Sequence, residues 1–100
     1  MSPRVASVDG NQNDIVDALR AAGARVQLLH TVGHGCPDTL VAFRGAWYVA
    51  EIKNPQGRNR LTPDQVLWHK DFGIHARIYI WRTVRQALCD IGAVHWEGAL

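Results

Sequence analysis

The sequence predicts an α/β fold in which helices flank a mixed, four-stranded central sheet. Apolar residues recur at helical spacing near the start of the chain, and three strand-like runs follow them. A strong helix-start signal then precedes a fourth run, so the order is helix, three strands, helix, strand and helix. One hundred residues, 47% of them hydrophobic, predict one small domain over 1–100 with a globular core.

The first helix is expected over 11–22, after a segment over 1–10 that lacks periodicity and is expected to be partly disordered. Gly23 is a natural stop, and the apolar stripe of the helix consists of Ile15, Ala18, Leu19 and Ala22. A first strand is expected over 26–32, where side chains alternate between two faces. The two glycines of a loop over 33–37 let the backbone turn tightly and approach a ligand.

Strands over 39–43 and 47–53 are expected to form a hairpin around a two-residue Arg44-Gly45 turn. In that register Asp38 lies directly opposite Glu51, with Cβ atoms about 5 Å apart. Two carboxylates held so close repel each other unless a proton or a cation lies between them. The hairpin therefore predicts a site that takes up positive charge.

Lys53 lies two residues after Glu51, so the two side chains share a sheet face. Hard divalent ions such as Mg²⁺ favour sparse carboxylate sites that leave room for water and a substrate phosphate. The lysine can then polarise a water or neutralise charge on the phosphate. The alternative is a solvated face with a surface ion pair. The apolar neighbours in both strands indicate instead that these charges are buried, and charged residues on buried strands usually have a function.

The second helix has a clear start, because Thr62 can cap it, Pro63 suits its first position and Gln65 completes a capping box. It is expected to end at Gly73, and its Trp68 is expected to be a core residue rather than a platform for base stacking. A strand over 77–81 can then run parallel to the third strand by a right-handed crossover, and a final helix is expected over 84–91.

The chain resembles the PD-(D/E)XK nuclease superfamily, and most closely the small, stand-alone VRR-NUC type found in phages, which is related to Holliday-junction resolvases. The resemblance covers residues 11–81. In chain order, the matching motifs are Asn13-Asp14-Ile15-Val16, Gly35-Cys36-Pro37-Asp38, Glu51-Ile52-Lys53 and Leu61-Thr62-Pro63-Asp64-Gln65. Glu-x-Lys alone is a weak signal, but the ordered set is fairly specific.

The resemblance implies a restriction-endonuclease-like core and a divalent-metal-dependent DNA endonuclease that leaves a 5′-phosphate and a 3′-hydroxyl. Asp38 and Glu51 would hold Mg²⁺ or Mn²⁺, with the Ile52 carbonyl as a third ligand. Lys53 would orient or help deprotonate the attacking water. Such nucleases often carry a glutamate on the first helix that faces the site, and Asp14 is the best match here, with a shorter side chain.

Gln65 has two candidate roles. The capping box alone would explain it, whereas in the resembled family a glutamine after the E-x-K strand lies near the active site. One side-chain conformer would not easily serve both roles. His69 lies one turn later on the same helix face, where it is a candidate for DNA contact or proton transfer, although a surface or hydrogen-bonded histidine is the more common case.

The net charge of +2 does not establish nucleic-acid binding, but Lys53, Arg58 and Arg60 cluster beside the proposed site. Arginine suits phosphate because its planar fork can bond bidentately, although both arginines could also serve only to keep the loop over 54–61 soluble.

His34 and Cys36 lack the second ligand pair of a structural zinc site. A Cys36 nucleophile would need a histidine base, and no pairing is specified.

Two cysteines, no segment like a signal peptide and no membrane-spanning stretch favour an intracellular, cytoplasmic protein. The resemblance implies a phage or bacterial setting. The expected partner is DNA, and branched DNA such as a Holliday junction in particular. Symmetric cutting of a junction needs two sites, which predicts a two-fold homodimer with an apolar interface. The competing interpretation is a nucleic-acid-binding or interaction module on the same fold, without turnover.

Overall fold

The computed structural model describes residues 10–94 and has the expected order of elements. These are α1 (Gly10–Ala21), β1 (Arg25–Leu28), β2 (Thr39–Phe43), β3 (Ala46–Ile52), α2 (Pro63–Gly73), β4 (Ile78–Trp81) and α3 (Val84–Asp90). The predicted α/β fold, with a mixed four-stranded sheet and three helices packed against it, is confirmed. The expectation of disorder over 1–10 falls almost wholly outside the described residues. No helix within 10–94 is both long and apolar enough to cross a bilayer.

The strands lie in the order β1-β2-β3-β4. β1 and β2 pair antiparallel, as do β2 and β3, whereas β3 and β4 pair parallel. A parallel pair needs a long crossover connection, and the segment that contains α2 supplies it. The predicted parallel pairing of the third and fourth strands is therefore confirmed.

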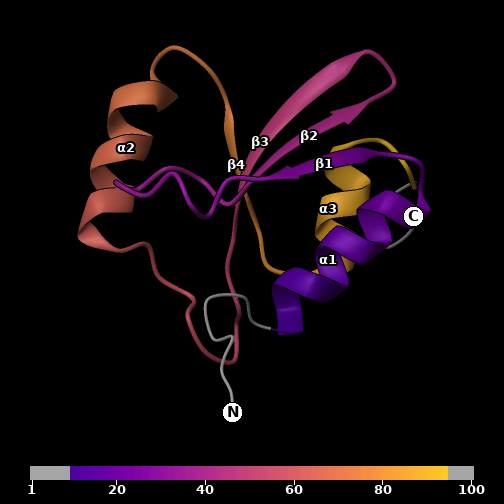
Figure 1. Ribbon diagram of the computed structural model, residues 1–100, viewed down its shortest axis with the longest axis horizontal. Coiled ribbons are helices and arrows are strands. Elements are labelled where there is room, and N and C mark those ends of the chain that lie inside the picture. Colours follow the sequence, from indigo (N-terminus) through magenta and orange to yellow (C-terminus); the bar gives the residue numbers. More distant parts are fainter. Residues whose placement is uncertain (1–9, 95–100) are drawn as a thin grey trace, which may run out of the picture.

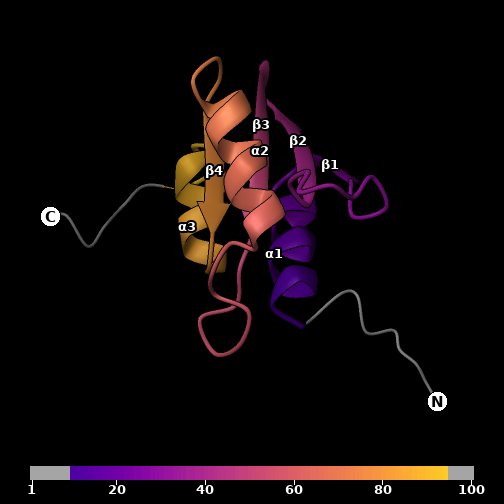
Figure 2. The same ribbon diagram turned by 90° about the vertical axis from the view of Figure 1, so that its left-hand side faces the viewer.

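The two faces of the sheet are covered unequally. Figure 1 shows α1 and α3 together on one side of the strands and α2 on the other, and Figure 2 looks onto the α2 side. α2 has no buried residue, and Trp68 is half-buried and stacks on Phe72 at 3.7 Å between ring centroids. The prediction that Trp68 is a core residue is therefore wrong. The core lies on the α1–α3 side and consists of Ile15, Val16, Leu19, Ala24, Val41, Phe43, Ala50, Ile52, Trp81, Ala87 and Ile91.

The β2–β3 hairpin has the predicted turn and register. Arg44 and Gly45 both have positive φ, at 48° and 86°, which suits a two-residue turn whose twist matches the flanking strands. Phe43 pairs with Ala46 and Thr39 with Ala50. Continued by one residue, this register brings Asp38 opposite Glu51, as expected.

β1 is shorter than predicted, because it ends at Leu28 rather than at Val32. The Leu29 amide donates to the Asp38 carbonyl at 2.7 Å, and the Val32 amide then donates to the Leu29 carbonyl at 2.9 Å. The second bond closes a turn, so the chain leaves the sheet. The apolar alternation over 29–32 resembled a strand, but Val32 is exposed.

The loop that follows β1 packs directly on the start of α2. A Cβ atom at Gly35 would lie 2.2 Å from the Asp64 carbonyl oxygen, and Gly35 has a φ of +83°. No residue other than glycine fits there, so this position holds the loop against the first turn of α2.

Gly35→Ala is expected to destabilise the protein more than Gly33→Ala does. Both glycines have positive φ, so each alanine incurs about 1 kcal/mol for left-handed backbone. Only Gly35 faces neighbouring backbone, since a Cβ at Gly33 meets nothing within 4 Å, and the clash should cost about 1–3 kcal/mol more. Urea denaturation measures the difference. Equal losses of stability would contradict the packing of this loop on α2.

Candidate active site

Asp38 is fixed at the point where the chain enters β2. Its Oδ2 accepts a hydrogen bond of 2.8 Å from the Ile52 amide, and its carbonyl accepts from the Leu29 amide. Pro37, just before it, is fully buried. The carboxylate is therefore tied to the end of β3 by one oxygen, which leaves the other available for a ligand.

Glu51 lies on the α2 side of the sheet and is only 1% exposed. Its Oε2 accepts a hydrogen bond of 2.9 Å from Gln65 Nε2 and lies 3.5 Å from Lys53 Nζ. Its Oε1 is buried, and no residue in the described part of the chain donates a hydrogen bond to it. A buried carboxylate oxygen without a partner is costly, so this atom is suited to a missing ligand.

Lys53 follows β3 directly and is 5% exposed. Its Nζ donates a hydrogen bond of 2.7 Å to Gln65 Oε1, and its amide donates to the Trp81 carbonyl at 3.0 Å. Its own carbonyl accepts from Asn11 Nδ2 at 2.8 Å. Contacts from β4, α1 and α2 thus hold the lysine at the carboxylate pair.

Gln65 serves both of the roles that the sequence analysis treated as alternatives. Its Oε1 accepts a hydrogen bond from the Thr62 amide at 2.9 Å, and its own backbone amide donates to Thr62 Oγ1 at 3.2 Å, which completes the capping box. The same Oε1 also accepts from Lys53, while Nε2 donates to Glu51. The expectation that one conformer would not easily serve both roles is wrong, because an amide oxygen has two lone pairs and its nitrogen is free to donate.

The electrostatics of the pair follow from its burial. Burial, and then the adjacent Asp38 carboxylate, raise the pKa of Glu51 to about 8, although Lys53 opposes the rise. At neutral pH without metal, the proton on Glu51 relieves the repulsion, and the Lys53 ammonium balances Asp38. If a divalent cation replaced the proton, the cluster would carry net positive charge, which favours an anionic ligand such as phosphate.

Two further side chains near this cluster, His69 and Cys36, have shifted pKa values. Burial, and then the charge of Lys53, lower the pKa of His69, whose Nε2 is buried and has no hydrogen-bond partner among the described residues. Burial, then Glu51 and Asp38, raise the pKa of the Cys36 thiol. Because a thiolate is the reactive form, this environment disfavours a Cys36 nucleophile.

The other predicted residues lie farther from the pair. Asp14 is exposed on α1, and no cluster of three or more His, Cys, Asp or Glu side chains within 10–94 is arranged to hold a metal, so the structure does not bring Asp14 to Asp38 and Glu51. Arg58 and Arg60 are exposed in the loop between β3 and α2. That loop is ordered by a bond from the Asn54 amide to the Arg58 carbonyl at 2.9 Å.

Sequence reasoning missed two supporting side chains. Asn11 Nδ2 bridges the Lys53 and Arg82 carbonyls, at 2.8 and 3.1 Å, and so joins the start of α1 to the ends of β3 and β4. Arg82 donates from Nε to Asn59 Oδ1 at 2.6 Å and anchors the loop that carries the two arginines. Both contacts span more than twenty residues, so no local pattern could reveal them.

The donor atoms at the pair fit a hard divalent cation. Asp38 and Glu51 offer carboxylate oxygens, one of them the buried Oε1 that lacks a hydrogen bond. Oxygen donors in small number are what Mg²⁺ and Mn²⁺ accept, because both ions retain water and bind substrate phosphate. The Ile52 carbonyl lies in the same short segment and remains the predicted third ligand.

Comparisons of the chain with family models, with curated proteins and with solved structures find no match. No relative therefore supplies an activity. The function has to be inferred from the chemistry of the site itself.

Glu51→Gln is expected to flatten the pH dependence of stability. The folded protein keeps the Glu51 proton up to about pH 8, whereas the unfolded chain releases it near the ordinary value of 4.5. The free energy of unfolding should therefore fall as pH rises between these values, and glutamine removes that fall. Urea denaturation in EDTA from pH 5 to 9 tests this. Asp71→Asn, an exposed acid on α2, is the control; equal slopes in wild type and Glu51→Gln would refute the burial effect.

Proposed function

We propose that this protein is a divalent-metal-dependent endonuclease that hydrolyses DNA phosphodiester bonds, with the site chemistry of the PD-(D/E)XK nucleases. The observation that carries the proposal is the pair of Asp38 and the buried Glu51: Glu51 Oε1 has no hydrogen-bond partner among the described residues, and its Oε2 lies 3.5 Å from the ammonium of Lys53. Two carboxylates and a lysine at the sheet, with a glutamine that reaches them from α2, match the residues that the motif resemblance assigns to such a site.

A purely structural role explains this cluster poorly. A surface ion pair would be solvated, yet Glu51 and Lys53 are 1% and 5% exposed. Burying charges costs several kcal/mol each unless geometry and hydrogen bonding are excellent, and here one carboxylate oxygen has no described partner. Groups kept at such a cost, with a strongly shifted pKa, are typical of functional sites.

Each residue has a definable task in the proposed reaction. Asp38 and Glu51 would hold the cation, which when bound stabilises negative charge on the scissile phosphate and makes water a better nucleophile. Gln65 holds Lys53 Nζ in place through Oε1. Lys53 would direct its remaining N–H groups at the attacking water or at the phosphate, where charge grows mainly in the transition state.

The proposed substrate is branched DNA, such as a Holliday junction, and the exposed Arg58 and Arg60 would contact its phosphates. Symmetric cutting of two strands by a chain with one site requires two copies. α2 offers an apolar surface for this purpose, which we call the α2 surface; its exposed residues are Val66, Leu67, Phe72 and Ile74. Exposed apolar patches of this kind mark interaction sites.

Asp38→Asn, Glu51→Gln and Lys53→Met are each expected to lower the single-turnover cleavage rate by about a hundredfold or more. The test uses labelled four-way junction, flap, duplex and single-stranded DNA with Mg²⁺, Mn²⁺ or EDTA. Wild type should cut a branched substrate only with metal. Lys53→Met should retain DNA binding, because its contact strengthens mainly in the transition state.

The matched control is Asp71→Asn, which removes an exposed carboxylate from α2 and should leave cleavage unchanged. Circular dichroism confirms that each variant is folded. Full activity in Asp38→Asn or Glu51→Gln would eliminate the proposed site. DNA binding by wild type without cleavage in either metal would favour the competing binding module.

Leu67→Glu is expected to convert a wild-type dimer into a monomer at micromolar concentration. Leu67 belongs to the α2 surface and is 66% exposed, and a charge buried in an apolar interface has no partner. Sedimentation velocity reports the state, with Gln56→Glu in the exposed loop after β3 as the control. A wild-type monomer that cuts four-way junctions symmetrically would rule out the dimer.

A further inference from the structure

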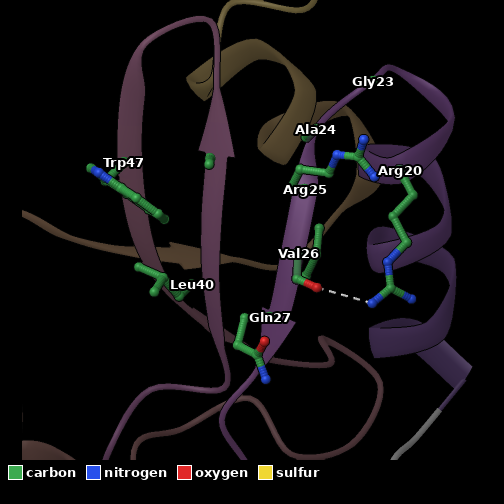
Figure 3. Close-up of a pocket in the computed structure, with 9 residues that line it drawn as sticks. Arg20, Gly23, Ala24, Arg25, Val26, Gln27, Leu40 and Trp47 are labelled. Atoms are coloured by element: carbon green, nitrogen blue, oxygen red, sulfur yellow. Dashed lines mark hydrogen bonds between the residues drawn. The ribbon is translucent and has the colours of Figure 1, made fainter.

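A groove lies on the same sheet face as the carboxylate pair, at the opposite end of the β2–β3 hairpin. It has a volume of about 920 Å³ and is lined by residues of α1, β1, β2 and β3 and of the turn after α1. Figure 3 shows Trp47 on one side of this groove and Arg20 and Arg25 on the other. The assigned site chemistry does not use any of these three side chains.

The sheet register explains the shape of the groove. Arg25 pairs with Ala42, and Ala42 pairs with Trp47, so the three residues form one row across β1, β2 and β3. Neighbouring strands lie about 4.8 Å apart, so the outer two residues are separated by about 10 Å. The small side chain of Ala42 between them leaves a trough with an arginine at one rim and an indole at the other.

Trp47 is unusual for a residue of a paired strand, because it is 70% exposed. The aromatic contacts among residues 10–94 join other rings and leave the Trp47 indole without a stacking partner. An indole is a rigid, flat side chain that stacks well on other ring systems. Its open face can accept another flat, apolar group.

The opposite rim is basic and lacks acids. None of the nine lining residues is Asp or Glu, and neither Arg20 nor Arg25 forms an ion pair with another described residue. Arg20 Nη2 donates to the Val26 carbonyl at 3.0 Å, and the Arg25 side chain extends toward Arg20 (Figure 3). Two guanidinium groups on one rim, with no carboxylate among the lining residues, are complementary to phosphate.

The groove lies on the same strand face as the candidate active site. Side chains alternate along a strand, so Trp47, Val49 and Glu51 share one face of β3. Four residues at about 3.3 Å each separate Trp47 from Glu51 by about 13 Å. A strand of nucleic acid leaving the carboxylate pair along this face would reach Trp47 within a few nucleotides.

We propose that this groove binds an unpaired nucleotide of the substrate, with its base stacked on Trp47 and the adjoining phosphate held by Arg25 and Arg20. The proposal rests on the proposed function for its choice of DNA. A base inside a duplex presents only its edges, whereas an unpaired base presents the face that an indole requires. The groove therefore selects branched substrates that carry a single-stranded segment, such as a flap.

The test measures affinity in EDTA, where the proposed reaction cannot proceed, by fluorescence anisotropy. The probes are a labelled duplex with a five-nucleotide single-stranded flap and the same duplex without it. Wild type should bind the flap substrate about tenfold more tightly, and Trp47→Ala should abolish that difference while Trp47→Phe keeps most of it. An abasic nucleotide placed at one flap position should weaken wild type by a similar factor and leave Trp47→Ala unaffected.

Arg25→Ala provides an independent check, because it should lower the slope of log affinity against log salt by about one. Arg77→Ala is the matched control; Arg77 lies over the Tyr79 ring, on the opposite face of the sheet, so its loss should leave flap selectivity intact.

The possible outcomes separate the groove from the proposed function. If wild type cleaves with metal and Trp47→Ala keeps the flap affinity of wild type, nucleotide binding in the groove is overturned and the proposed function stands. If flap binding depends on Trp47 but no cleavage occurs, nucleotide binding in the groove is supported and the nuclease activity is rejected. If Trp47→Ala changes the oligomeric state in sedimentation velocity but not the flap affinity, the groove is a contact surface for a second copy of the chain, and the proposal is overturned.

Discussion

The repulsion between Asp38 and Glu51 is the interaction on which the rest of the site depends. The hairpin register brings them opposite each other, and burial raises the pKa of Glu51 to about 8. The surrounding contacts compensate for this repulsion: the Ile52 amide binds one carboxylate, while Gln65 and Lys53 bind the other. The remaining oxygen, Oε1, has no described hydrogen bond, so the cluster is complete only when a proton or a cation is present.

The start of α2 couples helix formation to the geometry of the site. The side chain of Gln65 closes the capping box with Thr62 and also bridges Lys53 and Glu51. Gly35 lets the loop before β2 approach the same turn, at a distance that excludes any Cβ atom. α2 buries none of its residues, so these polar and backbone contacts, rather than apolar packing, fix its first turn relative to the sheet.

The two sheet faces have different roles, since one carries the apolar core and the other carries the charged residues. This separation explains how so small a chain can hold a buried charged cluster. α1 and α3 bury the apolar core on one face, with Trp81 and Ile15 fully enclosed. The other face is covered by α2 only in part, which leaves the carboxylate pair, the row from Arg25 to Trp47 and the α2 surface on one side of the molecule. Stability and proposed function therefore use separate surfaces, and changes on the open face need not disturb the core.

The sequence by itself determined the element order, the Arg44-Gly45 turn and the opposition of Asp38 and Glu51, because hairpin register follows from turn length and side-chain alternation. It also indicated Gln65, through the local capping pattern. Local patterns could not show where β1 ends, since the Leu29 amide bonds to Asp38 across a loop. Only the tertiary structure decided that one glutamine conformer serves two roles, that Asn11 holds Lys53, that Asp14 stays outside the cluster and that Trp47 remains exposed. Each of these depends on segments distant in sequence, whose approach is set by packing of the whole fold.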